Sequence, residues 1–114
     1  MTFSRIDRIN ELIKETLAHI LHEEIEIPPE VFLTVVKVDT SRDLRYAKVF
    51  FSVFPEKKIG EISRLLEKKM YFIQGKLNKK LHLKPLPRID FLVDKTEAKA
   101  GKIEKLLKDI SKEN

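Results

Sequence analysis

The apolar residues between positions 62 and 81 constrain the fold of this chain most strongly. They recur every three or four residues, the spacing of one buried helix face. The first part of the stripe consists of Ile62, Leu65 and Leu66, and the second part of Met70, Ile73, Leu77 and Leu81. On a straight helix these two parts would point about 70° apart. The same helix would turn Lys69, Lys76 and Lys80 toward the first part, and burying three unpaired ammonium groups costs too much. The pattern therefore predicts two helices, or one kinked helix, that change direction near Lys69–Phe72.

The same region holds the positive charge of the chain. Between Arg64 and Arg88 there are eight basic residues and one acid, Glu67, so this stretch has a net charge of +7. The whole chain carries +5, so the rest of it sums to −2. A local block of positive charge attracts phosphate groups, and the bend would align its lysines beside the apolar stripe. Lysine rows are also common on helix faces that only contact water, and this alternative stays open.

The beginning of the chain has the pattern of a capped helix. An apolar stripe runs from about Ser4 to about Glu24, with Ser4 as the N-cap and Asp7 three positions later. An acid at Asp7 is favourable beside the positive end of the helix dipole. Pro28-Pro29 then prevents continuation of the helix.

Three short segments have the composition of strands. Val31–Thr40 and Tyr46–Phe54 are rich in β-branched and aromatic residues, and turn formers between them predict an antiparallel hairpin. Asp43 is expected to bond its own backbone in that turn rather than to act as a catalytic acid. After two prolines, Ile89–Asp94 is the third strand. Helices packed on one face of a three-stranded sheet bury these stripes, so we predict an α+β fold.

The end of the chain is assigned separately. Thr96–Ser111 could form a helix, although Ala100-Gly101 weakens its beginning. We expect one domain over residues 1–95 and a tail, helical or mobile, over residues 96–114. A ferredoxin-like sheet would need a fourth strand, and no fourth segment has that composition.

Several classes of function are disfavoured by what the sequence lacks. It has no cysteine and no apolar run near ~18 residues, so we expect a cytoplasmic protein without thiol chemistry. It has no glycine-rich phosphate loop and no paired histidine and carboxylate, so we expect no catalysis. His19 and His22 are spaced like metal ligands, but no third ligand is evident, and we expect no metal and no cofactor. Phe72 is expected in the core, whereas Tyr71 points away from the stripe and could stack on a base.

Four motifs in order resemble a known family. They are Arg5-x-x-Arg8, Ser41-x-Asp43-Leu44 followed by Ala47-Lys48-Val49, Phe72-Ile73 with Leu77, Leu81 and Leu83, and Pro87-x-Ile89-x-Phe91-x-x-Asp94. From about Arg5 to Leu107 the chain resembles bacterial ribosome-binding factor A. Members of that family typically carry Ala-x-Gly at the bend, where this chain has Lys69-Met70-Tyr71. They commonly have arginine where this chain has Gln74.

The resemblance implies a KH-like (type II) domain with the order α-β-β-α-(bend)-α-β. It also implies a monomeric, non-catalytic assembly factor that binds the small (30S) ribosomal subunit and its 16S rRNA late in maturation. Such a factor supports 5′-end processing of the rRNA precursor and adaptation to cold. RNA-binding KH domains usually clamp a single strand with a Gly-x-x-Gly loop, which this chain lacks. We therefore expect recognition of folded RNA through its shape and its phosphates.

The residues expected to bind RNA fall into two ranks. The first rank is Lys68, Lys69, Lys76, Lys79, Lys80, Lys84 and Arg88. The second rank is Arg42, Arg45, Arg5 and Arg8. Surface salt bridges are the competing role for the second rank. The competing function is that of a protein–protein adaptor whose basic helices dock on an acidic partner.

Overall fold

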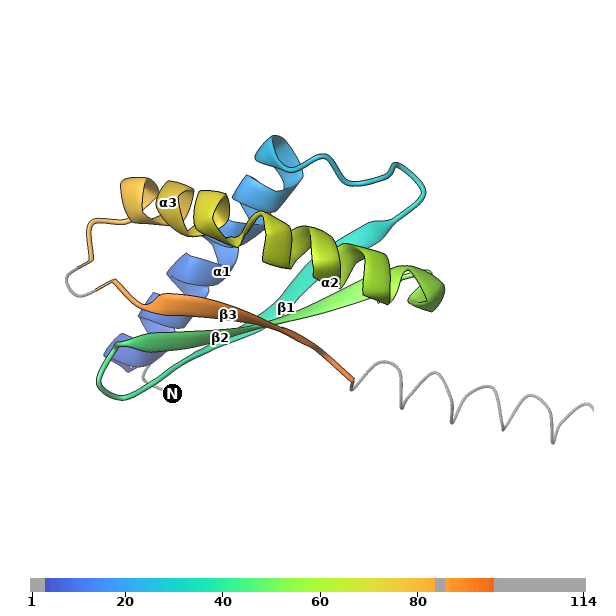
Figure 1. The fold of residues 1–114 in the computed structure, drawn as a ribbon. Coiled ribbons are helices and arrows are strands. Elements are labelled where there is room, and N and C mark those ends of the chain that lie inside the picture. The colour runs from blue at the N-terminus through green and yellow to red at the C-terminus, as the bar shows by residue number, and fades with distance from the viewer. Residues whose placement is uncertain (1–3, 84–85, 96–114) are drawn as a thin grey trace, which may run out of the picture.

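The computed structural model describes residues 4–83 and 86–95 of the chain. These residues form three α-helices, one 3-10 helix and three strands. The elements are α1 (Arg5–Glu24), β1 (Phe32–Thr40), β2 (Tyr46–Phe54), the 3-10 helix η1 (Glu56–Lys58), α2 (Ile59–Lys68), α3 (Met70–Lys80) and β3 (Arg88–Val93) (Figure 1). This confirms the predicted order of helices and strands. The tail helix predicted over Thr96–Ser111 lies outside the described residues. No helix in the described part of the chain is both long enough and apolar enough to cross a membrane.

Helix α1 begins at the predicted cap. The N–H of Asp7 donates to the hydroxyl of Ser4, and the N–H of Ser4 donates to the carboxylate of Asp7, each over 3.1 Å. This reciprocal pair satisfies two N–H groups that the helix itself leaves without a partner. The apolar stripe of α1 then lies buried along the helix, with Ile13 and Leu17 fully enclosed. The chain becomes extended at Ile25, three residues before the first proline.

The turn between β1 and β2 is organised by Asp43. The hydroxyl of Ser41 donates to the carboxylate of Asp43 over 2.6 Å, and the N–H of Arg45 donates to it over 3.1 Å. These hydrogen bonds, that of Ser41 foremost, favour the ionised carboxylate and lower the pKa of Asp43. Leu44 takes a left-handed backbone with φ of 60° and packs its side chain against the core. The predicted turn role of Asp43 is confirmed.

The sheet has the order β1-β2-β3, with β2 at its centre. Strands β1 and β2 run antiparallel from Phe32 opposite Phe54 to Thr40 opposite Ala47, with an irregularity between Val35 and Lys37. Strand β3 pairs parallel to β2. Parallel neighbours need a long crossover connection, and the chain uses α2 and α3 for it.

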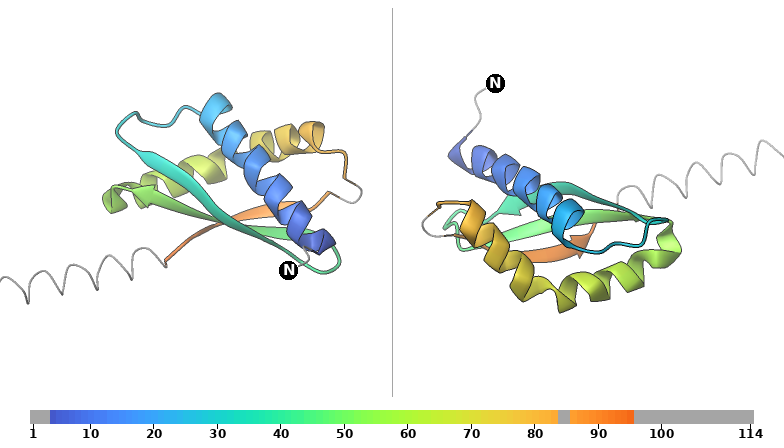
Figure 2. Two further views of the ribbon diagram at one scale, coloured as in Figure 1. Left: turned by 180° about the vertical axis from the view of Figure 1, so that it is seen from behind. Right: turned by 90° about the horizontal axis from the view of Figure 1, so that it is seen from above.

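All three helices cover one face of this sheet, as predicted (Figure 1). Seen from above, α1 lies along one side of this helix layer and the bent α2–α3 pair lies along the other (Figure 2). Alternate residues of β2 point into the core, so Ala47, Val49, Phe51 and Val53 are all buried. From the helices, the fully enclosed side chains are Ile13, Leu17, Ile20, Ile62, Leu66, Ile73 and Leu77. One apolar core therefore fixes the bent helix pair against the sheet.

The other face of the sheet has no helix over it in the described part of the chain (Figure 1). It carries the opposite residues of β2, including Phe54, which is 68% exposed and lies opposite the equally exposed Phe32. The ammonium of Lys37 lies 4.7 Å from the ring centre of Phe50 on this face. A lysine over an aromatic ring keeps the ring partly covered and the charge in water.

Candidate RNA-binding face

The bend between α2 and α3 falls at Lys69, within the predicted segment. Lys69 has φ of −96° and ψ of 6°, and it interrupts the helix for a single residue. Its N–H still donates to the carbonyl of Leu65 over 3.0 Å, and its own carbonyl accepts from Ile73 over 2.9 Å. The change in direction lets Leu66 before the bend and Ile73 after it both reach the core. The shift of the apolar stripe is thus explained.

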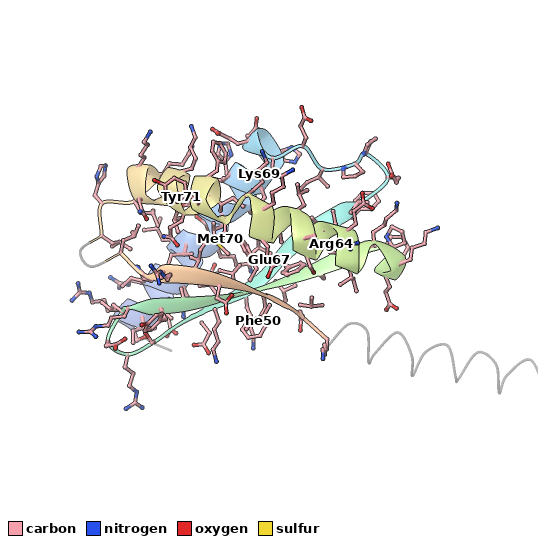
Figure 3. The ribbon with its side chains drawn as sticks, in the orientation of Figure 1. Phe50, Arg64, Glu67, Lys69, Met70 and Tyr71 are labelled. Carbon is pink, nitrogen blue, oxygen red and sulfur yellow. The ribbon has the colours of Figure 1, made fainter. Side chains whose placement is uncertain are left out.

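This bend does not require a small residue. Because φ at Lys69 is negative, its backbone needs none of the freedom that glycine offers. Tyr71, where the family typically has glycine, is 94% exposed, so its ring does not crowd the joint. Figure 3 shows Lys69, Met70 and Tyr71 where the two helices meet. Met70 is half-buried and packs against the core. The bend at Lys69-Met70-Tyr71 is therefore held by the packing of Met70 against the core, without a small residue.

Most of the first-rank lysines are exposed on the bent helix pair. Lys68 and Lys69 lie at the bend, and Lys79 and Lys80 lie in the last turn of α3. Positive charge in the last turn also favours the negative end of the helix dipole. Lys84 lies outside the described residues. The structure thus places four first-rank lysines, Lys68, Lys69, Lys79 and Lys80, on one bent element, and we call them the lysine row.

Lys76 has a different environment from the lysine row. Its side chain is only 34% exposed, and its ammonium lies 3.3 Å from the carboxylate of Glu24 at the end of α1. The same ammonium lies 5.5 Å from the ring centre of Phe72. Lys76 therefore links α3 to α1, and a phosphate would have to compete with Glu24 for it. Its predicted contact with RNA stays a prediction, and it is a poor choice for a charge-reversal test.

The prediction that Phe72 belongs to the core is wrong. Its side chain is 41% exposed. The helix phase is reset at Lys69, so Ile73 and Leu77 point inward and the preceding residue, Phe72, falls on the flank of α3. There its ring borders Lys76 instead of the sheet.

Gln74 has a structural role that the sequence did not reveal. Its side-chain carbonyl accepts from the N–H of Ile89 over 2.9 Å, and its amide donates to the carbonyl of Pro87 over 3.2 Å. The amide also donates to Asn78 over 3.0 Å. The side chain therefore satisfies two backbone groups at the start of β3, while an arginine here would have no oxygen to accept from Ile89. No local sequence pattern predicts these hydrogen-bond partners, because they lie 13 and 15 residues away from Gln74.

Replacing Gln74 with alanine should lower the free energy of unfolding by about 1–3 kcal/mol, because it leaves two partly buried backbone groups without partners. Urea unfolding followed by circular dichroism measures this loss. Asn78→Ala is the matched control: it removes only the side chain that Gln74 contacts within α3, and it should cost under about 0.5 kcal/mol. Equal stability of the two variants would contradict a bridging role for Gln74.

The predicted arginines gather at one end of the molecule rather than beside the bend. The N–H of Arg88 donates to the carbonyl of Arg45 over 2.8 Å, so the start of β3 adjoins the hairpin turn. The side chain of Asn10 accepts from the N–H of Thr40 over 2.9 Å, which brings the start of α1 to the same end. Figure 1 shows these three segments together. The exposed arginines at this end are Arg5, Arg8, Arg42, Arg45 and Arg88. The predicted residues thus form two groups, one on α2–α3 and one around the turn.

Comparison with known proteins identifies relatives of this chain. The model of the family named Ribosome-binding factor A matches residues 5–107. Ribosome-binding factor A of Natranaerobius thermophilus is 38% identical over 112 residues, which cover 97% of this chain and 86% of that protein. Its counterpart in Thermodesulfovibrio yellowstonii is 34% identical over 96% of this chain and 93% of that protein.

Solved structures show the same fold. The crystal structure of ribosome-binding factor A from Thermus thermophilus matches with a TM-score of 0.66 at 24% identity, over 77% of this chain and 93% of that one. The solution NMR structure of a Thermotoga maritima relative matches with a TM-score of 0.63 at 28% identity, over 78% of this chain and 86% of that one. The predicted α+β, KH-like fold is confirmed. With a family match from residue 5 to residue 107, the chain belongs to the ribosome-binding factor A family.

Proposed function

We propose that this chain binds the small ribosomal subunit and its 16S rRNA late in maturation, and that it supports processing of the 5′ end without catalysing it. The binding domain is residues 1–95, and its action is cytoplasmic. A homology model of the Thermus thermophilus ribosome-binding factor A, fitted into a cryo-EM map of a 30S complex, matches this chain with a TM-score of 0.63 at 26% identity. That match covers 75% of this chain and 90% of the other.

The single observation that carries the proposal is the lysine row. A stretch with a net charge of +7 is folded so that Lys68, Lys69, Lys79 and Lys80 are exposed while the apolar side of the same helices is buried. Ammonium groups held on a rigid element can each neutralise an rRNA phosphate and release a counterion. Such contacts fix position and orientation on folded RNA and read little sequence. The arginines around the turn offer a second contact region.

Co-sedimentation with purified small and large subunits tests the proposal. The wild type should pellet with small subunits and not with large ones. A Lys79→Glu, Lys80→Glu variant should lose most of this binding, because it replaces two attractive charges with two repulsive ones. We avoid Lys76, since glutamate there would face Glu24 and disturb the packing of α3 on α1. Circular dichroism and a thermal melt verify that the variant is folded.

A matched control carries the same change in charge elsewhere. Lys57→Glu, Lys95→Glu alters two exposed lysines outside the lysine row and should pellet like the wild type. Equal pelleting with both subunits would contradict the proposal, as would equal effects of the two double variants. If the lysine row instead docks on an acidic protein, binding should survive digestion of the subunit RNA, whereas RNA binding should not.

A further inference from the structure

A shallow groove lies on the outer side of α3, just after the bend. Its volume is about 440 Å³, and it is lined by Tyr71, Phe72, Gln74, Gly75, Lys76, Asn78 and Lys79. This volume falls within the range of sites that hold small ligands, about 300–1,000 Å³. The lining combines two aromatic rings, two ammonium groups and a bare stretch of helix backbone.

Gly75 forms that bare stretch, and the fold itself does not explain it. A glycine inside a helix costs about 1 kcal/mol relative to alanine, and Gly75 lies in the middle of α3. Its φ is not positive, so the backbone conformation does not require glycine. A Cβ atom built there would meet nothing within 4 Å, so packing does not require glycine either. The missing side chain leaves the helix surface open to the close approach of a ligand.

Tyr71 and Lys79 stand on either side of this opening. Positions 71, 75 and 79 are four residues apart, so they share one row along the helix, about 12 Å long. At one end is a tyrosine ring that is 94% exposed, and at the other is an exposed ammonium. A single exposed ring gives a nucleobase a face to stack on, and the ammonium suits a phosphate. Lysines are depleted in protein–protein interfaces, and two lysines border the two rings of this groove, so its chemistry suits a nucleotide better than a protein partner.

We propose that the groove over Gly75 holds one unpaired nucleotide of the small-subunit RNA, with its base stacked on Tyr71, its sugar over Gly75 and a phosphate at Lys79. This inference rests on the proposed function and adds a local contact with a base to recognition through phosphates. Tyr71 stands at the bend where the family typically has glycine, and in this arrangement the tyrosine contributes to binding.

Gly75→Ala separates stability from binding. The variant should raise the midpoint of thermal unfolding by about 3–5 °C, because alanine favours the helix. It should also weaken binding to purified 30S subunits several-fold, because the methyl group lifts the nucleotide off the helix. The control is Gly60→Ala, a second helical glycine whose added Cβ would be 3.9 Å from its nearest neighbour, the side chain of Arg64. It should bind 30S subunits like the wild type.

Tyr71 variants test the stacking itself. Tyr71→Ala should lower the affinity for 30S subunits about tenfold. Tyr71→Phe should keep the affinity of the wild type, since stacking needs the ring and not the hydroxyl. Phe54→Ala, which removes another exposed aromatic ring from the face of the sheet that carries no helix in the described part of the chain, is the control and should leave the affinity unchanged.

Three outcomes would overturn the inference. If Gly75→Ala and Tyr71→Ala bind like the wild type while Lys79→Glu, Lys80→Glu fails, the groove is not a nucleotide site and the proposed function stands. If all these variants, Lys79→Glu, Lys80→Glu included, bind 30S subunits like the wild type, the role assigned to the lysine row fails as well; the proposed function itself fails if the wild type does not bind them. If Tyr71→Ala weakens binding to 30S subunits but not to protein-free 16S rRNA, the groove contacts a ribosomal protein instead of a nucleotide.

Discussion

Reversing the charge of the whole lysine row should reduce the affinity for small subunits by at least about a hundredfold at moderate salt. The variant carries Lys68→Glu, Lys69→Glu, Lys79→Glu and Lys80→Glu. Each lysine that neutralises a phosphate releases a counterion on binding, so losing four such contacts should also make the log–log dependence of affinity on salt shallower, by about three to four units of slope. Binding titrations with purified 30S subunits between about 50 and 200 mM salt measure both quantities.

The control for this variant must carry the same total charge. Glutamate at four other lysines, Lys14, Lys48, Lys57 and Lys95, gives the same net change outside the lysine row. A general electrostatic attraction between a basic protein and a polyanion would weaken equally in both variants. We expect the control to lose far less affinity and to keep most of the salt slope. Equal losses would show that the lysine row has no special part in binding.

Phe51→Ala should destabilise the fold by about 3–5 kcal/mol, which is a large share of the roughly 5–15 kcal/mol that typically holds a domain of this size together. Phe51 is 2% exposed and lies on the central strand, where both other strands pair. Its ring meets Phe91 edge to face, with centroids 6.1 Å apart and planes at 82°. Truncation would therefore open a cavity between the sheet and the helices and remove an aromatic pair between β2 and β3.

Phe54→Ala is the matched control, since it removes the same side chain from the same strand. Phe54 is 68% exposed on the other face of the sheet, so we expect a loss under about 1 kcal/mol. Urea unfolding followed by circular dichroism gives both free energies. A similar loss for the two variants would contradict the assignment of the core to the helix-covered face alone.

Local patterns in the sequence predicted the features that depend on neighbouring residues. The β-branched and aromatic composition of Tyr46–Phe54 identified a strand, and the shift of the apolar stripe identified a bend between two helices. Ser4 with Asp7 marked the start of α1, and Asp43 marked the turn. Each of these depends on interactions within a few positions of the chain, where periodicity and capping rules apply.

Features that depend on distant residues were not predictable in this way. Lys76 looked like a free cation because its partner, Glu24, belongs to another helix. Gln74 stood out only as a departure from the family's usual arginine, because its backbone partners lie beyond the end of α3. Phe72 was placed in the core as a large apolar ring, although it lies outside the stripe of Met70, Ile73 and Leu77, and its ring borders Lys76 instead. For the candidate site, the sequence therefore supplied the residue types, and tertiary contacts decided which of them are exposed.

The parallel pairing of β3 with β2 also sets the order in which this molecule can be assembled. The β1–β2 hairpin closes a short turn, so it can form within microseconds. Strand β3 reaches β2 only after Pro55–Pro87 has been made and folded back, and contacts across such long loops form slowly. Gln74 then links α3 to β3 by a hydrogen bond, so we expect the last strand and the bent helices to reach their final positions together. During synthesis from the N-terminus, we therefore expect the lysine row to reach its final geometry only after β3 has left the ribosome that makes it.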